Sequence, residues 1–267
     1  MQWSKPAPGT KLQTGHPLMN GLLIFCPFNE GGGVFRNLLA RPSNPIDSLS
    51  ATYEWAASSR FGGALRHLAI TDQQILGRVT NIPLPMTTGC TVAVGYRKTD
   101  ATLRASVAFD VASGTLGAKL RAHLPYSDGV VYWDFGGQTS GTTRLAVSGL
   151  TFGDDFWVFS TGGRGMEVWQ NGSLKGSNAA NPARTVNDSA INFVLGKQGV
   201  VDGDLADFSY FALWNRQLTQ RDVRSLSGQP FQLFASPLSG VAAHATSPGG
   251  DGGGGGQNSS LLLMGVG

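Results

Sequence analysis

The sequence predicts an all-β fold, an antiparallel β-sandwich, and three observations lead to this prediction. Apolar and polar residues alternate with a period of two in a series of short segments, which is the pattern of strands with one buried face. Clusters of Gly, Asn, Asp and Ser separate these segments, and the 38 glycines are about twice the usual share. Hydrophobic residues make up 41% of the 267 residues, enough to fill a sandwich core.

The predicted strands are short and recur through most of the chain. They are residues 22–25, 91–96, 105–109, 118–122, 131–135, 156–159, 166–169, 191–195 and 205–214. In the fifth of these, Val131, Trp133 and Phe135 share one face, which is expected to be buried. In the last, Phe208, Tyr210 and Trp214 are likewise expected on one side of the strand.

A β-hairpin is predicted at residues 166–174. Asn171 and Gly172 lie at its centre, and both residue types tolerate the positive φ angles that a two-residue type I′ turn requires.

One short helix is predicted near the C-terminal end of the sandwich, at residues 218–226. Thr219 can be its N-cap, and Asp222 stands three residues later as a variant of the capping box. Leu218 and Val223 can pack as a hydrophobic staple, and Gly228 can end the helix.

Composition divides the chain into three parts. Residues 1–20 carry several prolines and glycines and are predicted to form an extended N-terminal arm. Residues 21–228 form the predicted sandwich. Residues 229–267 are predicted to form a Gly-rich C-terminal arm, and its apolar tip is Leu261, Leu262, Leu263 and Met264. A solitary apolar tip favours aggregation unless it docks on a neighbour, so the tip is interpreted as an assembly element.

The charge pattern narrows the function classes. Only 14% of the residues are charged and the net charge is +3, with no cluster of basic residues of the kind that binds nucleic acid. No apolar stretch reaches the roughly 18 residues of a transmembrane helix, so no membrane insertion is expected. The N-terminus lacks the apolar region of a signal peptide, which predicts synthesis in the cytoplasm.

The two cysteines, Cys26 and Cys90, each lie in or beside an apolar run. They are expected to be buried free thiols, and the alternative is a disulfide formed in an oxidising compartment.

Three segments together resemble the laminin-G-like, concanavalin A-like jelly-roll domain. Residues 156–163 are the first, and residues 168–172 (Val-Trp-Gln-Asn-Gly) resemble the family's Tyr-x-Asn-Gly hairpin. Residues 193–219 end in Asn-Arg-Gln-Leu-Thr and resemble the final strand of the family and the start of its short helix. The resemblance covers residues 150–220 and implies a jelly-roll sandwich.

Shorter strings are similar to laminin-G-like domains that bacteriophages encode in virion structural proteins. These are residues 16–18 and 123–137, and residues 229–234 resemble another recurring feature of bacteriophage proteins. The resemblance implies a virion surface protein, namely a capsid decoration, a head fibre or a tail-fibre component.

Catalytic motifs matter because glycosidases also use this fold. Glycoside hydrolysis requires two carboxylates flanking the bond, and Glu30, Glu54 and Glu167 each lack a second acidic residue within four positions. Glu167 is the candidate of a hydrolase hypothesis, but it is expected to face solvent on the hairpin strand. The sequence also lacks a Gly-x-Ser-x-Gly elbow, so the protein is predicted not to be an enzyme.

The densest acidic cluster contains Asp202, Asp204 and Asp207. Because Ca²⁺ binds several carboxylate and carbonyl oxygens, these residues are the candidate metal site, and the alternative is a polar turn entering a strand. No cofactor other than calcium is expected.

Candidate ligand-binding residues lie in one loop and the strand that follows it. Tyr126, Asp128, Tyr132 and Trp133 combine aromatic rings with a carboxylate, the groups that stack on a sugar ring and bind its hydroxyls. Trp133 has the alternative position in the core with Val131 and Phe135.

The main functional hypothesis is a non-enzymatic virion structural protein that assembles through its arms and displays a lectin-like sandwich. It predicts a homo-oligomer with other virion proteins as partners, made in the host cytoplasm and located in the virion. The alternative hypothesis is a lectin-like module that binds host-surface carbohydrates or receptors, and a glycoside hydrolase is the third.

Overall fold

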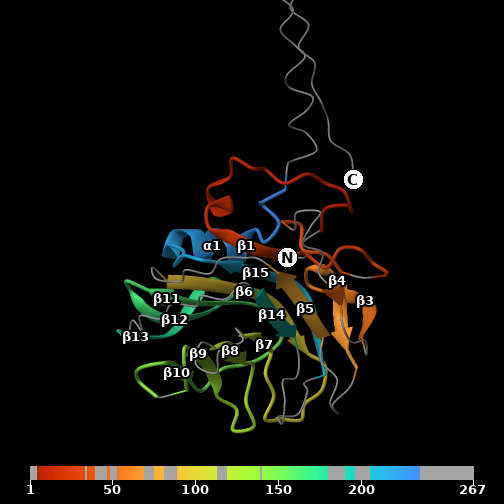
Figure 1. Cartoon of the computed structure of the whole chain (residues 1–267). Helices are drawn as coiled ribbons and strands as arrows, with labels where there is room; N and C mark the ends of the chain where they lie inside the picture. Colours follow the sequence, from red (N-terminus) through yellow and green to blue (C-terminus); the bar gives the residue numbers. More distant parts are fainter. Residues whose placement is uncertain are drawn as a thin grey trace, which may run out of the picture. The chain divides into compact units, whose positions relative to one another are not determined.

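The computed structural model describes residues 5–33, 35–39, 47–48, 53–68, 75–80, 89–112, 119–138, 140–179, 190–195 and 205–234. Their strands form two antiparallel sheets that face each other in a jelly-roll sandwich (Figure 1). This architecture confirms the predicted fold class.

The first sheet, called here the eight-stranded sheet, has the strands in the spatial order β13 (Ser173–Asn178), β12 (Gly165–Gln170), β11 (Asp154–Gly162), β6 (Gly89–Lys98), β15 (Ala206–Trp214), β4 (Gly62–His67) and β3 (Tyr53–Ser59). Strand β1 (Leu22–Cys26) pairs with the second half of β15. The seven-stranded sheet has the order β10 (Arg144–Val147), β9 (Val131–Phe135), β8 (Lys119–His123), β7 (Phe109–Ala112), β14 (Ala190–Leu195), β5 (Ile75–Thr80) and β2 (Asp47–Ser48).

A large apolar cluster fills the space between the sheets. Phe159 on β11 packs against Trp133 on β9 and Phe109 on β7, with ring centroids 5.5 Å apart in both pairs. Val131 and Phe135 are buried beside Trp133, which confirms the predicted inner face of that strand. The alternate residues of β8 and β9 therefore lie on the opposite, outer face of the seven-stranded sheet.

Both cysteines belong to this core. Cys26 and Cys90 are buried and unpaired, as predicted. Burial raises the pKa of each thiol above its ordinary value, so both remain protonated and unreactive.

A second apolar cluster covers the outer face of the eight-stranded sheet. It joins Phe156 and Tyr210 of the sheet to Leu226 of α1 (Gln220–Gly228) and to Leu18 of the short 3₁₀ helix η1 (Pro17–Met19). In Figure 1, α1 and β1 lie above β15 and β6 on this face. Among the described residues, no helix is long and apolar enough to span a membrane.

The two sharpest local predictions are confirmed. Strands β12 and β13 form the hairpin, and Asn171 and Gly172 have φ angles of 51° and 80°, as a type I′ turn requires. Thr219 caps α1, and the reciprocal hydrogen bonds of the capping box with Asp222 are both present.

The prediction for one face of β15 is wrong. Phe208 lies in the core between the sheets, whereas Tyr210 and Trp214 lie in the outer cluster. The register with β6 shifts between Phe208 and Tyr210, so Ser209 is an extra residue. Such a β-bulge moves the residues after it to the other face of the strand. The strand predicted at 105–109 also begins later than expected, at Phe109.

The described part of the predicted N-terminal arm packs against its own sandwich. Lys5 Nζ donates hydrogen bonds to the carbonyl oxygens of Pro27 (2.5 Å) and Phe28 (2.7 Å). Leu12 forms a β-bridge with Phe234, a residue of the second apolar cluster. Residues on both sides of the predicted sandwich boundaries therefore contribute to its packing.

Lys5 gives the fold a testable pH dependence. Burial lowers the pKa of its ammonium group to about 7, although the charges of Glu30 and Asp154 act in the other direction. Between pH 7 and the unfolded value of 10.5, the unfolded chain binds a proton that the folded chain lacks, so the free energy of unfolding should rise with pH. Below pH 7 both states are protonated and the contribution is constant.

Denaturant unfolding of the wild type and of Lys5→Met from pH 6 to pH 10 isolates this contribution. We expect the wild-type stability, measured relative to the variant, to increase between pH 7 and pH 10. Parallel profiles of the two proteins would contradict the assignment.

Candidate functional site

A row of alternating charges crosses the outer face of the seven-stranded sheet. Asp110 on β7 is opposite Arg121 on β8, Arg121 is opposite Asp134 on β9, and Asp134 is opposite Arg144 on β10. Arg121 Nη2 lies 2.5 Å from Asp110 Oδ2, and Arg144 holds both carboxylate oxygens of Asp134 at 2.5 and 2.6 Å. Opposite charges in direct cross-strand register stabilise the pairing of neighbouring strands.

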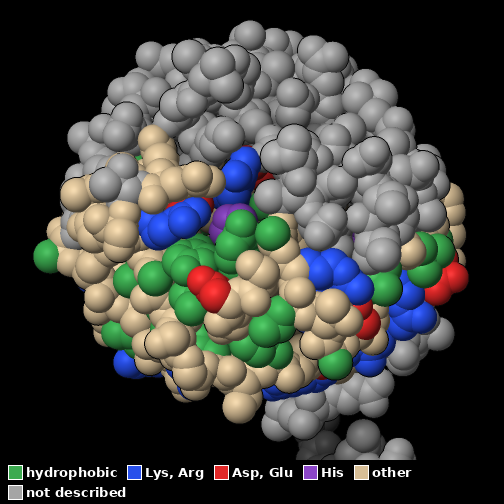
Figure 2. Space-filling model, turned by 90° about the horizontal axis from the view of Figure 1, so that it is seen from below, with side chains coloured by type: hydrophobic (Ala, Val, Ile, Leu, Met, Phe, Trp, Pro, Cys, Tyr) green, Lys and Arg blue, Asp and Glu red, His purple; other side chains and the backbone are tan. Residues whose placement is uncertain are grey.

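This face contains a pocket of about 270 Å³, called here the His123 pocket. Its lining residues are Arg121, His123, Tyr126, Tyr132, Gln138 and Arg144. Figure 2 shows this side of the molecule, where basic side chains (blue) and a histidine (purple) gather beside side chains of the hydrophobic class, which includes tyrosine (green). Pockets that combine aromatic rings with a few polar groups are typical of ligand sites.

His123 supplies a buried polar atom that no described residue satisfies. Its Nδ1 lies 2.5 Å from the carbonyl oxygen of Ser106, so Nδ1 must carry the hydrogen of the ring. Nε2 is buried and has no hydrogen-bond partner among the described residues, and Asp134 Oδ2 lies 3.8 Å from it. Buried polar atoms are usually hydrogen-bonded, which makes Nε2 a candidate contact for a ligand.

Two tyrosines complete the wall of the pocket. The ring of Tyr126 meets that of His123 edge-on at 4.9 Å and that of Tyr132 at 5.8 Å. The Tyr132 hydroxyl donates a hydrogen bond of 2.7 Å to Asp128, and this bond raises the pKa of the hydroxyl. The Arg144 guanidinium lies 4.5 Å from the centre of the Tyr132 ring. These contacts fix the orientation of the aromatic groups before any ligand binds.

The structure brings together three of the four predicted ligand-binding residues. Tyr126 and Tyr132 line the His123 pocket, and Asp128 accepts a hydrogen bond from the Tyr132 hydroxyl. Trp133 does not join them, because it is fully buried in the core and donates its indole N–H to Thr161 Oγ1 at 2.9 Å.

The other residues of the pocket were not predicted from the sequence. Arg121, His123, Gln138 and Arg144 line it as well. Alternation was the available signal for two of them, because Arg121 and His123 flank Ala122, which faces the core on β8. Their meeting with Arg144 depends on the order of β8, β9 and β10 in the sheet, which no local pattern specifies.

Of the predicted metal site, only Asp207 lies in the described residues, since Asp202 and Asp204 fall outside them. Asp207 is fully buried and accepts hydrogen bonds from the guanidinium groups of both Arg66 and Arg97. Two cations at one carboxylate disfavour a third at the same oxygens. Within the described ranges, no group of three or more His, Cys, Asp or Glu residues could hold a metal ion.

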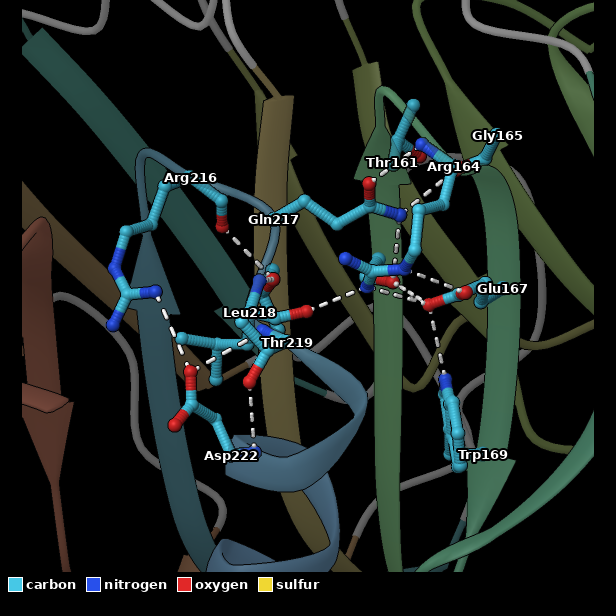
Figure 3. A network of polar contacts seen from close by, with 12 residues as sticks. Thr161, Arg164, Gly165, Glu167, Trp169, Arg216, Gln217, Leu218, Thr219 and Asp222 are labelled. Carbon is cyan, nitrogen blue, oxygen red and sulfur yellow. Dashed lines mark hydrogen bonds and ion pairs between the residues drawn. The ribbon is translucent and has the colours of Figure 1, made fainter.

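The expectation that Glu167 faces solvent is wrong. Its side chain is buried on β12 and accepts hydrogen bonds from Arg164, Ser160 and the indole of Trp169. Figure 3 shows the Arg164 guanidinium between Glu167 and Leu218, to whose carbonyl oxygen it donates at 2.6 Å. Glu167 thus helps to join the β11–β12 turn to the start of α1.

The electrostatics of Glu167 agree with this structural role. Burial acts to raise the pKa of its carboxyl group, but the hydrogen bonds from Arg164 and Ser160 and the charge of Arg164 bring that pKa below its ordinary value. The carboxylate is therefore ionised and held by donors on several sides.

Comparison with solved structures supports the fold. The binding domain of botulinum neurotoxin serotype G superposes with a TM-score of 0.58 at 11% sequence identity, covering 77% of this chain and 50% of that chain. A structure of botulinum neurotoxin type C gives a TM-score of 0.56 at 11% identity over 78% of this chain and 51% of the other. Its description states that cell entry of that toxin depends on interaction with two ganglioside molecules.

A sialidase is also similar in fold. The Trypanosoma rangeli sialidase, solved in complex with a difluorinated nononic acid, gives a TM-score of 0.54 at 13% identity and covers 86% of this chain and 37% of that chain. This chain thus spans about half or less of the length of each of these proteins. No protein-family model matches the sequence, and the search of curated proteins found no match. At these identities the comparisons establish the jelly-roll fold.

Proposed function

We propose that the chain is a non-catalytic, lectin-like module that binds carbohydrate in the His123 pocket. The observation that carries the proposal is the buried His123 Nε2, which has no hydrogen-bond partner in the described part of the chain and lies beside two tyrosine rings. Tyrosine rings pack against the apolar face of a sugar, and an imidazole nitrogen binds one of its hydroxyl groups.

The comparisons favour this alternative over the virion hypothesis. Two of the structures similar in fold are described with gangliosides or with a sugar acid, whereas none of the named matches is a bacteriophage protein. The predicted assembly tip, Leu261 to Met264, lies outside the described residues. Assembly through the arms, a homo-oligomer and a virion location therefore remain predictions.

A glycan array followed by titration of the bound glycans tests the proposal. We expect Tyr126→Ala to weaken binding about two- to thirteenfold, because an aromatic contact contributes about 0.5–1.5 kcal/mol. Leu174→Ala is the control, since it removes an exposed side chain from β13 in the other sheet. Binding that is absent, or equally strong in both variants and the wild type, would contradict the proposed site.

A further inference from the structure

We propose that the His123 pocket selects acidic sugars, that is, terminal saccharides that carry a carboxylate or a sulfate group. This inference rests on the proposed function and specifies its ligand class. Three observations support it. They are the positions of the Asp and Arg side chains of the charged row, the fixed orientation of the Arg144 guanidinium, and the absence of a hydrogen-bond partner for His123 Nε2 among the described residues.

In the charged row on the outer face of the seven-stranded sheet, the carboxylates are more deeply buried than the guanidinium groups. The side chains of Asp110 and Asp134 are 0% exposed, whereas those of Arg121 and Arg144 are 10% and 21% exposed and line the pocket. A ligand in the pocket therefore contacts guanidinium groups, while the carboxylates lie behind them. The electrostatic potential inside the pocket is therefore more positive than the equal numbers of Asp and Arg suggest. The arginines are closer to a bound ligand than the carboxylates, and the interaction energy of two charges falls with distance.

The Arg144 guanidinium is preorganised for an anion. Its Nε and Nη2 are held by Asp134 in a bidentate pair, which raises the pKa of the group, and its face packs on the Tyr132 ring. Across the described ranges, Asp134 is the hydrogen-bond acceptor of this guanidinium, so the donors of Nη1 and the second hydrogen of Nη2 remain for a ligand. A guanidinium edge of this kind matches the geometry of a carboxylate or a sulfate, and its immobilisation reduces the entropy lost on binding.

His123 adds a requirement that a simple anion does not meet. Because Nδ1 donates its hydrogen to the Ser106 carbonyl oxygen, Nε2 is the acceptor nitrogen of this tautomer. Nε2 is buried and unpartnered among the described residues, so its natural partner is a hydroxyl group. A ligand with an acidic group for the arginines, a hydroxyl for His123 and an apolar face for Tyr126 is an acidic sugar.

The volume of the pocket sets the size of the group that enters it. Drug-sized ligands occupy pockets of about 300–1,000 Å³, and the His123 pocket measures about 270 Å³. It therefore fits one terminal sugar residue, and the rest of a glycan would extend into solvent.

Matched glycans test the inference on the full-length chain. The probes are N-acetyllactosamine, its sialylated form and its sulfated form, titrated by calorimetry at low ionic strength. We expect at least one acidic form to bind tenfold or more tightly than the neutral form, and its identity distinguishes carboxylate from sulfate recognition. We expect Arg144→Gln to abolish this preference.

Two further variants keep the test decisive. Arg221→Gln on α1 removes one exposed positive charge on the other sheet and should leave the preference intact. Because Arg144→Gln leaves Asp134 buried without its partner, the double variant Asp134→Asn with Arg144→Gln removes both charges together and should also lose the preference while remaining folded.

The outcomes separate the inference from the proposed function. Equal affinity for neutral and acidic glycans overturns the inference but leaves the carbohydrate-binding proposal standing. A preference for acidic glycans that survives in the folded double variant overturns the inference, since the acid is then bound elsewhere. Absence of binding to every glycan overturns both.

Discussion

Replacing Asp207 with alanine should lower the free energy of unfolding by about 3 kcal/mol, because removal of one partner from a buried ion pair costs about 3–5 kcal/mol. Asp207 on β15 lies directly opposite Arg66 on β4 and Arg97 on β6. Its side chain is 0% exposed, and its oxygens accept hydrogen bonds from both guanidinium groups, including one of 2.7 Å from Arg66 Nε. We expect the lower end of the range because the two arginines are 29% and 30% exposed and can be partly solvated.

Glu54→Gln is the matched control for this experiment. Glu54 pairs with the same Arg66 at 3.3 Å but is 50% exposed, and exposed ion pairs contribute about 0–1 kcal/mol. Denaturant unfolding of the two variants should therefore separate them by about 2 kcal/mol or more. A loss of less than about 1 kcal/mol in the Asp207 variant would contradict the structural role of this carboxylate.

The same measurement tests the calcium hypothesis. If Asp207 belonged to a calcium site, added Ca²⁺ would stabilise the wild type by mass action and would not stabilise the variant. Asp207 is already paired with Arg66 and Arg97. We therefore expect that Ca²⁺ changes the difference in unfolding free energy between the wild type and the Asp207 variant by less than the error of the measurement.

Local sequence signals predicted the elements whose geometry is set by a few adjacent residues. The type I′ turn depends on the adjacent residues Asn171 and Gly172, and the capping box of α1 depends on two residues three positions apart. The inner face of β9 was equally accessible, because strict alternation places Trp133 in the core. These features need no knowledge of which strands become neighbours.

The bulge in β15 shows why the face of a strand could not be predicted in full. The extra residue Ser209 moves Tyr210 and Trp214 to the outer cluster. The alternation of apolar and polar residues in the sequence does not reveal this bulge. The partner strand accommodates the bulge with Gly95, where an added Cβ would lie 2.2 Å from Ser209 Oγ. Gly95 is about 114 residues earlier in the chain, so only the paired sheet reveals the connection.

The candidate site and Glu167 share this dependence on strand order. Tyr126, Asp128 and Tyr132 lie within seven residues and were predicted together, but the pocket also needs Arg121 and Arg144 from two other strands. The donors that hold the Glu167 carboxylate, Arg164, Ser160 and Trp169, all lie within seven positions of it in the sequence. A charged side chain can be buried when such donors satisfy it, but the pairing of β11 with β12 that places Ser160 opposite Glu167 is known only from the fold.

The strongest test of the two faces of β9 compares adjacent residues. Trp133→Ala should lower the free energy of unfolding by about 3–5 kcal/mol, the usual cost of removing a large aromatic side chain from a core. Trp133 is fully buried, packs against Phe159 and Phe109, and donates its indole N–H to Thr161 across the sandwich. Any loss of glycan binding in this variant should follow from unfolding, and it should disappear under conditions in which the variant remains folded.

Tyr132→Phe is the complementary change on the other face. It removes only the hydroxyl that donates to the exposed Asp128, so the free energy of unfolding should change by less than about 1 kcal/mol. The affinity for glycans should change more than the stability, because Tyr132 lines the His123 pocket. Trp133→Ala should therefore have the larger effect on stability, measured by denaturant unfolding. Tyr132→Phe should have the larger effect on the glycan affinity of the folded protein, measured by calorimetry. A Trp133 variant that is stable but does not bind would place Trp133 in the site and overturn the division of β9 into a core face and a binding face.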